Sequence, residues 1–238
     1  VPLDNRSICI VIQSIWYNTN EEAPTSTTAA VQNGTASNSQ ADATPPALIR
    51  IDRVYDSLRY GEYDFKYGLA EFGDNSQEAG AQNVWFNIDT KKEKKGNGKP
   101  VEVVSEVAVV DDGDGMNAEK LQRCLVLGET LRDPKPNGQK GIGRFGVGMT
   151  MASISLAKHV EVYSRTSPDE SFKFVYIDLD EIGNRDMVTV PEPVEKAPPA
   201  KYADKLDGSS GTIVILKKCD RLQTDPGANS DWISRCAA

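Results

Sequence analysis

The glycine-rich stretch GQKGIGRFGVGM, residues 138–149, constrains the fold of this chain more than any other feature. Five of its first eleven residues are glycine, and an apolar, helix-compatible run follows at once. Glycine tolerates positive φ and lets backbone N–H groups approach a ligand closely. A glycine turn that opens a helix also directs unpaired N–H groups and the positive end of the helix dipole at an anion. The stretch therefore predicts a phosphate-binding turn at the start of a helix.

Length and charge limit the class of protein. The chain has 238 residues, of which 39% are hydrophobic, and a net charge of −8. That length suits one large domain or two small ones, and it is sufficient to bury a substantial core. The acidic balance argues against broad electrostatic binding to nucleic acid, because such binding needs a basic face. It still allows a local basic patch.

The cysteines and the single histidine exclude several kinds of site. Cys9, Cys124, Cys219 and Cys236 show neither CxxC pairing nor metal-ligand spacing, so a Cys/His zinc site is not expected. Scattered single cysteines are typical of reduced thiols in a cytosolic protein. His159 opens a strand-like run, which favours a structural or surface role over that of a phosphoacceptor. Since no apolar run approaches the roughly 20 residues that span a bilayer, we expect a cytoplasmic protein with no membrane partner.

Composition divides the chain into four parts. Residues 1–17 form an apolar N-terminal arm, a strand or a short buried segment. Residues 18–47 are rich in Ser, Thr, Asn, Gln and Ala and lack any apolar period, which predicts a flexible low-complexity linker. The folded domain is expected over 48–222. Residues 223–238 are expected to be a C-terminal tail or the start of a missing transducer domain.

The hydrophobic patterns predict helices interleaved with strands that are mostly linked by hairpins. Two helical patterns lie before residue 81, a third helix is expected over 117–128 with Asn117 as its cap, and a fourth follows the glycine stretch. This order predicts an α+β two-layer sandwich, with a mixed, mostly antiparallel sheet covered by helices on one face. The predicted strands are 83–90, 101–112, 159–166, 172–179 and 211–218, with a charged hairpin turn over 91–100.

Glu71 and Asn75 are four residues apart, on one face of the second predicted helix. In this arrangement the carboxylate can take a proton from an attacking water, and the amide oxygen can ligate a hard cation. A solvated helix face is the alternative interpretation of such a pair.

The stretch VAVVDDGDGM, residues 107–116, is an apolar strand that runs into a tight turn. Asp111 ends the strand, and Gly113 and Gly115 allow the turn. A carboxylate at a strand end can accept a hydrogen bond from an exocyclic amine such as that of adenine. The alternatives are a plain acidic turn or a calcium loop. The calcium loop needs regularly spaced ligands and a closing Glu, whereas Met116 and Asn117 stand here.

Four stretches in this order resemble the boxes of the GHKL ATPases, the family of gyrase, the heat-shock-ninety chaperones, histidine kinases and MutL. The resemblance covers about residues 48–220 and implies the Bergerat ATP-binding fold. It is closest to the branch of heat-shock-ninety, MutL and Microrchidia proteins. The matching stretches are AEFGDNSQEAGA for the N box, VVDDGDGM, KGIGRFGVGM, and GTIVIL for the strand with the late threonine.

The resemblance implies a role for each matching residue. Glu71 would activate the hydrolytic water, and Asn75 would ligate Mg²⁺. Asp111 would bind the adenine amine with help from Thr212, and residues 117–142 would form a mobile lid over ATP. Lys140 and Arg144 are either phosphate contacts or solvated loop charges. The remaining implied nucleotide-binding residues are Gly113, Gly115 and Met116 at the base and Gly141, Gly143, Phe145, Gly146, Val147 and Gly148 at the phosphates.

The resemblance implies a Mg²⁺-dependent ATPase that hydrolyses ATP slowly and acts as a nucleotide-gated dimerisation clamp in a larger protein. ATP and ADP would be its ligands, and an ATP-dependent homodimer its assembly. The alternative is a non-hydrolysing nucleotide-binding scaffold or a kinase-type module. Modules of this family serve chaperoning, DNA repair, chromatin handling and defence against foreign DNA, so the client protein or DNA stays open.

Overall fold

The computed structural model describes residues 6–11, 49–60, 65–94, 100–129 and 148–223. The strands in these residues form one seven-stranded sheet in the order β1-β2-β3-β7-β4-β5-β6, and every neighbouring pair is antiparallel. The five predicted strands are therefore confirmed, and the mixed sheet that we expected is antiparallel throughout the described pairs. The strands are β1 Arg6–Val11, β2 Asn83–Glu93, β3 Val101–Asp111, β4 His159–Arg165, β5 Lys173–Asp178, β6 Val194–Glu195 and β7 Gly211–Lys217.

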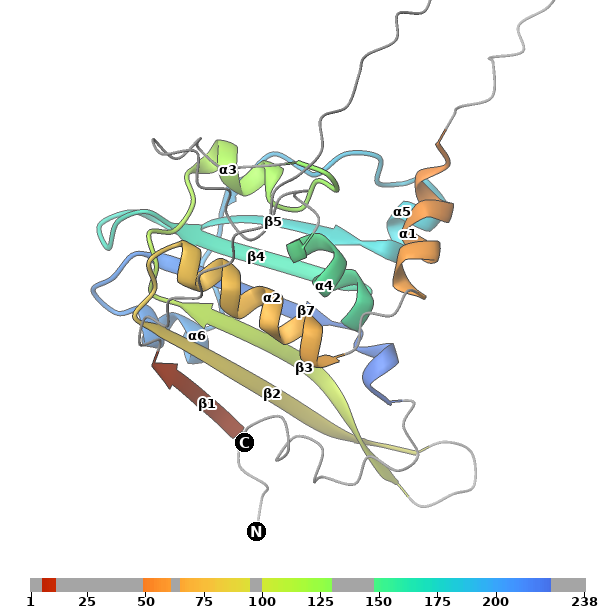
Figure 1. The fold of residues 1–238 in the computed structure, drawn as a ribbon, viewed down its shortest axis with the longest axis horizontal. Coiled ribbons are helices and arrows are strands. Elements are labelled where there is room, and N and C mark those ends of the chain that lie inside the picture. Colours follow the sequence, from red (N-terminus) through yellow and green to blue (C-terminus); the bar gives the residue numbers. More distant parts are fainter. Residues whose placement is uncertain (1–5, 12–48, 61–64, 95–99, 130–147, 224–238) are drawn as a thin grey trace, which may run out of the picture.

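The longer helices cover one face of this sheet, as the sequence predicts (Figure 1). Two of them, α2 and α4, pack against each other across the middle of the sheet, and α1 packs on α4 and α5. A Cβ on Gly68 would lie 3.0 Å from the Leu156 side chain, so the lack of a side chain at this position eases the close approach of α2 and α4. The helices are α1 Ile51–Arg59, α2 Phe65–Glu78, α3 Ala118–Arg123, α4 Gly148–Leu156, α5 Leu179–Asn184 and α6 Ala200–Ala203, with 3₁₀ turns η1 Asp204–Leu206 and η2 Asp220–Gln223.

The third predicted helix is shorter than expected. The cap is confirmed, because the Asn117 side chain accepts a hydrogen bond from the Lys120 N–H. The helix itself, α3, ends at Arg123, and residues 124–128 are turns. Leu121 and Leu125 are nevertheless both fully buried. The spacing of apolar residues predicts a helix to residue 128 because these residues are buried on one side. The turns that follow α3 bury Leu125 just as a longer helix would.

Alternation along the central strands builds two separate apolar layers. In β3, Val107 and Val109 face the helices, whereas Ala108 and Val110 face the opposite side. The short α6–η1 segment covers the centre of that second face with Tyr202 and Leu206, both at most 2% exposed. The two-layer sandwich is therefore confirmed, and its second sheet face carries a small cover of its own.

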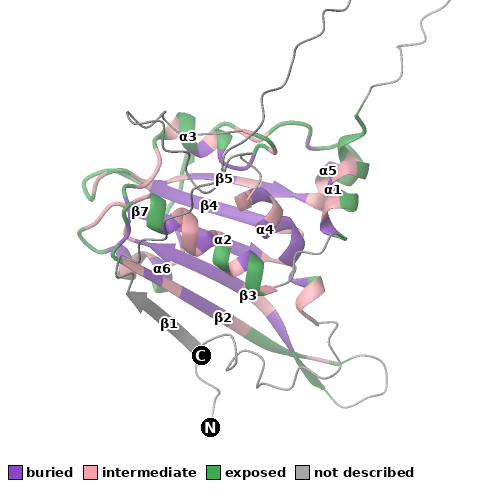
Figure 2. Cartoon of the chain, in the orientation of Figure 1, coloured by how far each residue is buried: buried purple, intermediate pink, exposed green. Residues whose placement is uncertain are grey.

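The outer part of the sheet is less buried than its centre. Figure 2 shows buried strands under α2 and α4 and exposed residues toward the far end of the β2–β3 hairpin. At the edge beyond β2, the backbone of β1 adds a strand in register, with Arg6 opposite Ile88 and Val11 opposite Asn83. Part of the predicted N-terminal arm thus pairs with the sheet. Among the described residues, no helix is both long and apolar enough to cross a bilayer.

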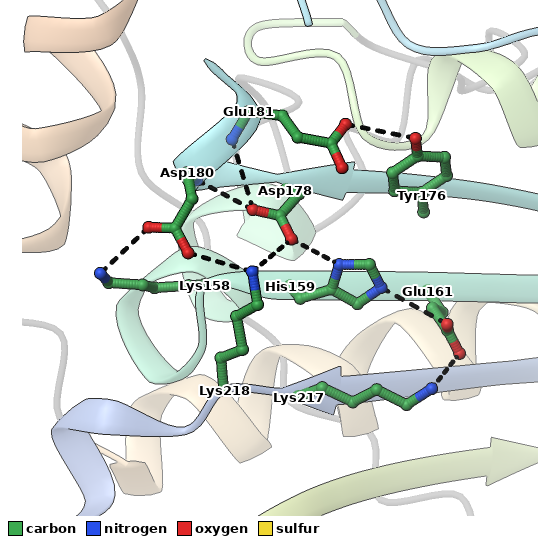
Figure 3. A network of polar contacts seen from close by, with 9 residues as sticks. All are labelled: Lys158, His159, Glu161, Tyr176, Asp178, Asp180, Glu181, Lys217 and Lys218. Carbon is green, nitrogen blue, oxygen red and sulfur yellow. Dashed lines mark hydrogen bonds and ion pairs between the residues drawn. The ribbon is translucent and has the colours of Figure 1, made fainter. Parts of the chain in front are cut away.

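A polar network on the second face joins β4, β5 and β7 (Figure 3). His159 Nδ1 lies 2.8 Å from Asp178, and its Nε2 lies 3.4 Å from Glu161. Hydrogen bonds to Glu161 and Asp178 raise the pKa of His159 against the opposing effect of burial. The histidine is therefore a structural residue of the second face, as its sequence context predicts.

We expect Asp178→Asn to lower the free energy of unfolding by about 2 kcal/mol at pH 7. Asp178 is 4% exposed, accepts from His159 and Lys218, and caps α5 through the Asp180 N–H. Burial acts to raise its pKa, but these hydrogen bonds lower it to about 2. The stabilisation is thus present above the ordinary pKa near 4 and is lost as the pH falls toward about 2.

Urea unfolding of the wild type and the variant at pH 7 and at pH 3 measures this effect. Asp180→Asn is the matched control, because Asp180 is exposed and should contribute less than about 1 kcal/mol. Equal stability of Asp178→Asn and the wild type at pH 7 would show that the network does not hold the β4–β5 end together.

Candidate functional site

Three polar side chains lie in register across the strand ends on the helix-covered face. Asp111 ends β3 and is paired with Thr212 on β7, which is paired with Ser164 on β4. All three are buried. On each strand, the nearest other residue on this face belongs to the helix-side apolar core. The buried side chains therefore change from apolar to polar at this end of the strands. Asp111 and Thr212, which the sequence places far apart, are therefore neighbours.

Asp111 is an acceptor with few protein partners. Its Oδ1 accepts from the Gly113 N–H at 3.1 Å, and its Oδ2 accepts from the Ser76 hydroxyl at 3.2 Å. Burial raises its pKa to about 6, although these hydrogen bonds act in the opposite direction. Above pH 6 the carboxylate is thus a buried anion, which is suited to accept hydrogen bonds from a donor.

Asp112, the residue after Asp111, forms hydrogen bonds within the protein. The Oδ1 of Asp112 accepts from the N–H groups of Gln82 and Asn83, both at 2.8 Å, and its Oδ2 accepts from the Asn83 amide at 2.8 Å. These bonds tie the turn after β3 to the start of β2. Of the two adjacent carboxylates, one is therefore committed to the fold and the other is available to a ligand.

Both glycines of this turn are required by contacts within the protein. A Cβ on Gly113 would lie 2.8 Å from the Ala79 carbonyl oxygen at the end of α2. Gly115 has a φ of 67°, and a Cβ there would collide with the Arg165 backbone. Met116 follows, partly buried against the helix-side core, with its N–H bonded to Ser164. The sequence predicts that these glycines allow a base to lie close to the backbone. In the structure they also allow the turn to lie close to the backbone of Ala79 and Arg165.

Glu71 and Gly148 form the other end of the site. Glu71 projects from α2, and its carboxylate lies directly against Gly148, the first residue of α4, so that any side chain at 148 would collide with Oε2. The N-terminus of a helix favours negative charge. The carboxylate therefore lies at the point where the glycine stretch enters its helix.

Polar atoms at this end suit a hydrated, charged ligand. The buried Nδ2 of Asn75 and the buried hydroxyl of Thr150, in the first turn of α4, have no hydrogen-bond partner among the described residues. Within the described part of the chain, no cluster of three His, Cys, Asp or Glu side chains is placed to hold a metal. Mg²⁺ often takes only one or two protein oxygens and completes its shell with phosphates and water. The side-chain oxygen of Asn75 would be the protein ligand in that mode of binding, whereas its Nδ2 can only donate a hydrogen bond.

The family model of the histidine kinase-, DNA gyrase B- and HSP90-like ATPases matches residues 63–212 of this chain. The chain belongs to this family, the GHKL ATPases. No curated protein matches the chain. Membership in a family of ATPases indicates ATP as the ligand of the site, and the sheet with its helical layer agrees with the Bergerat fold.

Much of the phosphate end of this GHKL site lies outside the described residues. The predicted lid is described only from Asn117 to Glu129, which includes α3. Gly148 is the one predicted phosphate residue that the structure describes. The others, Lys140, Gly141, Gly143, Arg144, Phe145, Gly146 and Val147, lie outside the described part of the chain.

Sequence reasoning missed two residues of this GHKL site. Ser76 lies 3% exposed on α2 beside Asp111, and Ser164 lies fully buried on β4 beside Thr212. Ser76 directly follows Asn75 in the N box, and four-residue spacing from the buried Phe72 could have identified it. Ser164 follows an apolar strand in a region with no motif, so only the strand register reveals it.

Proposed function

We propose that this chain binds ATP with Mg²⁺ and hydrolyses the nucleotide slowly. The contact of the Glu71 carboxylate with Gly148 carries the proposal. At the start of α4, a carboxylate can accept a proton from a water that attacks the terminal phosphate. A kinase-type module or a passive scaffold has no need of a base in this position.

The other residues divide the binding of the nucleotide among them. Asp111 and Thr212 would accept hydrogen bonds from the adenine end. The backbone of the glycine stretch would wrap the phosphates, with Lys140 and Arg144 beside them. Asn75 would hold Mg²⁺, which when bound neutralises charge that develops on the phosphates. Attack of water then breaks the terminal phosphoanhydride bond, and Glu71 takes the proton.

Nucleotide binding would control assembly, in the manner of the heat-shock-ninety, MutL and Microrchidia branch. The lid over 117–142 would close on ATP and promote a homodimer, and hydrolysis would release it. Nucleotide-dependent assembly and phosphate release are separate properties of such a clamp, so each needs its own measurement.

Three measurements on the purified chain test the proposal. Mg-ATP at about 100 times its Kd should stabilise the fold by roughly 2.7 kcal/mol, which a thermal shift detects. Phosphate release should be slow but above background, and light scattering should show a dimer with a non-hydrolysable analogue. Absence of a thermal shift would reject ATP binding. A shift without phosphate release would favour the scaffold, and a monomer in all states would reject the clamp.

A further inference from the structure

The Ser164 hydroxyl has three hydrogen-bond partners, and the function proposed above gives this residue no role. Its hydroxyl accepts from the Met116 N–H at 2.8 Å, donates to the Gly211 carbonyl at 3.0 Å and lies 3.0 Å from the Thr212 hydroxyl. The side chain is fully buried at the end of β4. It therefore joins the turn after β3, the start of β7 and the threonine of the site.

The number of protons fixes the direction of these bonds. A serine hydroxyl has one proton and two lone pairs. The Met116 N–H can only donate, which occupies one lone pair, and the Gly211 carbonyl can only accept, which occupies the proton. All three contacts can be hydrogen bonds at once only if Thr212 donates its proton to the second lone pair of Ser164. Thr212 consequently offers only lone pairs to any ligand.

The two ligand-facing groups thus have the same polarity. Asp111 stands opposite Thr212 in the strand register and is an acceptor when ionised. A pair of acceptors is complementary to an amino group with two N–H donors. An oxo group at the same position of a purine would bring lone pairs against lone pairs, and a buried mismatch of this kind is strongly rejected.

We propose that Ser164 is a specificity-determining positioning residue, which holds Thr212 as a hydrogen-bond acceptor and so makes the site prefer a 6-aminopurine to a 6-oxopurine nucleotide. This inference rests on the proposed binding of ATP at this site. It goes further because it assigns base selectivity to a residue that does not itself touch the base.

Affinities for ATP and for inosine triphosphate, which has a 6-oxo group, test the inference. Isothermal titration calorimetry at pH 8 should show at least about a hundredfold preference of the wild type for ATP. Ser164→Ala frees the Thr212 proton to point at the ligand. The preference should then fall by about tenfold, the effect of one hydrogen bond with the wrong polarity.

Two further variants separate this role from a structural one. Ser155→Ala is the matched control, since Ser155 is a buried serine on α4 whose hydroxyl donates to the Ala152 carbonyl of the same helix at 2.8 Å. It should leave the ratio of affinities unchanged. Thr212→Val should lower the ratio as Ser164→Ala does, and Ser164→Ala should then have no further effect on it.

The outcomes distinguish the two proposals. If Ser164→Ala weakens both nucleotides equally, with the ratio intact, the residue is only structural and the inference is overturned. Should Ser164→Ala not fold, an unchanged ratio in Thr212→Val overturns it as well. If the wild type binds neither nucleotide, the proposed function itself fails, and the inference with it.

Discussion

Glu71→Gln is expected to reduce the rate of ATP hydrolysis by about 10² to 10⁴-fold while changing the Kd for Mg-ATP by less than about threefold. Glutamine fills the same space against Gly148 but cannot accept the proton of the attacking water. Single-turnover phosphate release measures the rate, and calorimetry measures the affinity. Because the change keeps the shape of the site, it separates chemistry from binding.

Glu78→Gln provides a control on the same helix. Glu78 is an exposed carboxylate near the end of α2, so its replacement makes the same change of charge away from Gly148. It should leave hydrolysis within about twofold of the wild type. Equal losses of binding and hydrolysis in Glu71→Gln would place Glu71 in nucleotide binding, and an unchanged rate would rule it out as the base.

Asp111→Asn is expected to weaken ATP binding strongly and, at the same time, to stabilise the nucleotide-free protein. The amide can still accept from Gly113 and can donate to the Ser76 hydroxyl, so the internal hydrogen bonds survive. Its N–H₂ group would then face the amine of the base, donor against donor. We expect the Kd for Mg-ATP to rise by at least about 30-fold, so that the stabilisation at the same ATP concentration falls from about 2.7 kcal/mol to about 1 kcal/mol or less.

The gain in stability follows from the raised pKa of Asp111. Burial lifts this pKa from an ordinary 3.8 to about 6, so the folded state binds the proton more tightly than the unfolded state. The resulting destabilisation is absent below about pH 4, grows as the pH rises, and is complete above about pH 6. Removing the carboxylate should therefore add roughly 2 to 3 kcal/mol at pH 7.5 and little at pH 4.

Urea unfolding at these two pH values measures the effect, and Asp112→Asn is its control. Asp112 accepts three hydrogen bonds from Gln82 and Asn83, and a neutral amide would weaken these charge-assisted bonds. This variant should be less stable than the wild type at pH 7.5. If Asp111→Asn were also destabilised at that pH, Asp111 would belong to the fold and not to a ligand site.

The fold could largely be predicted from the sequence, and the misses are instructive. The strands followed from alternation, and the cap at Asn117 from its side chain, because both signals are local. The sequence predicts a longer α3 than the structure has. Leu125, whose spacing suggested a helix, is buried by the turns that follow Arg123. The second apolar layer under α6 was not predicted, because its members come from strands far apart in the chain.

The candidate site shows the same division between local and tertiary information. The sequence by itself determined the family, through boxes that carry Glu71, Asn75 and Asp111 in order, because the spacing of residue types along the chain is enough for that. Only the tertiary structure decided which groups meet. Antiparallel register set Asp111 beside Thr212 and brought in Ser164.

Gly148, near the end of the glycine stretch, shows the same division between local and tertiary information. From sequence, Gly148 was one of several glycines that could approach a phosphate. In the folded chain its missing side chain is what lets the Glu71 carboxylate lie at the start of α4. Local sequence specifies that a helix begins there, whereas the packing of α2 on α4 specifies which side chain stands at its first turn. That contact depends on residues 77 positions apart, and no local pattern contains it.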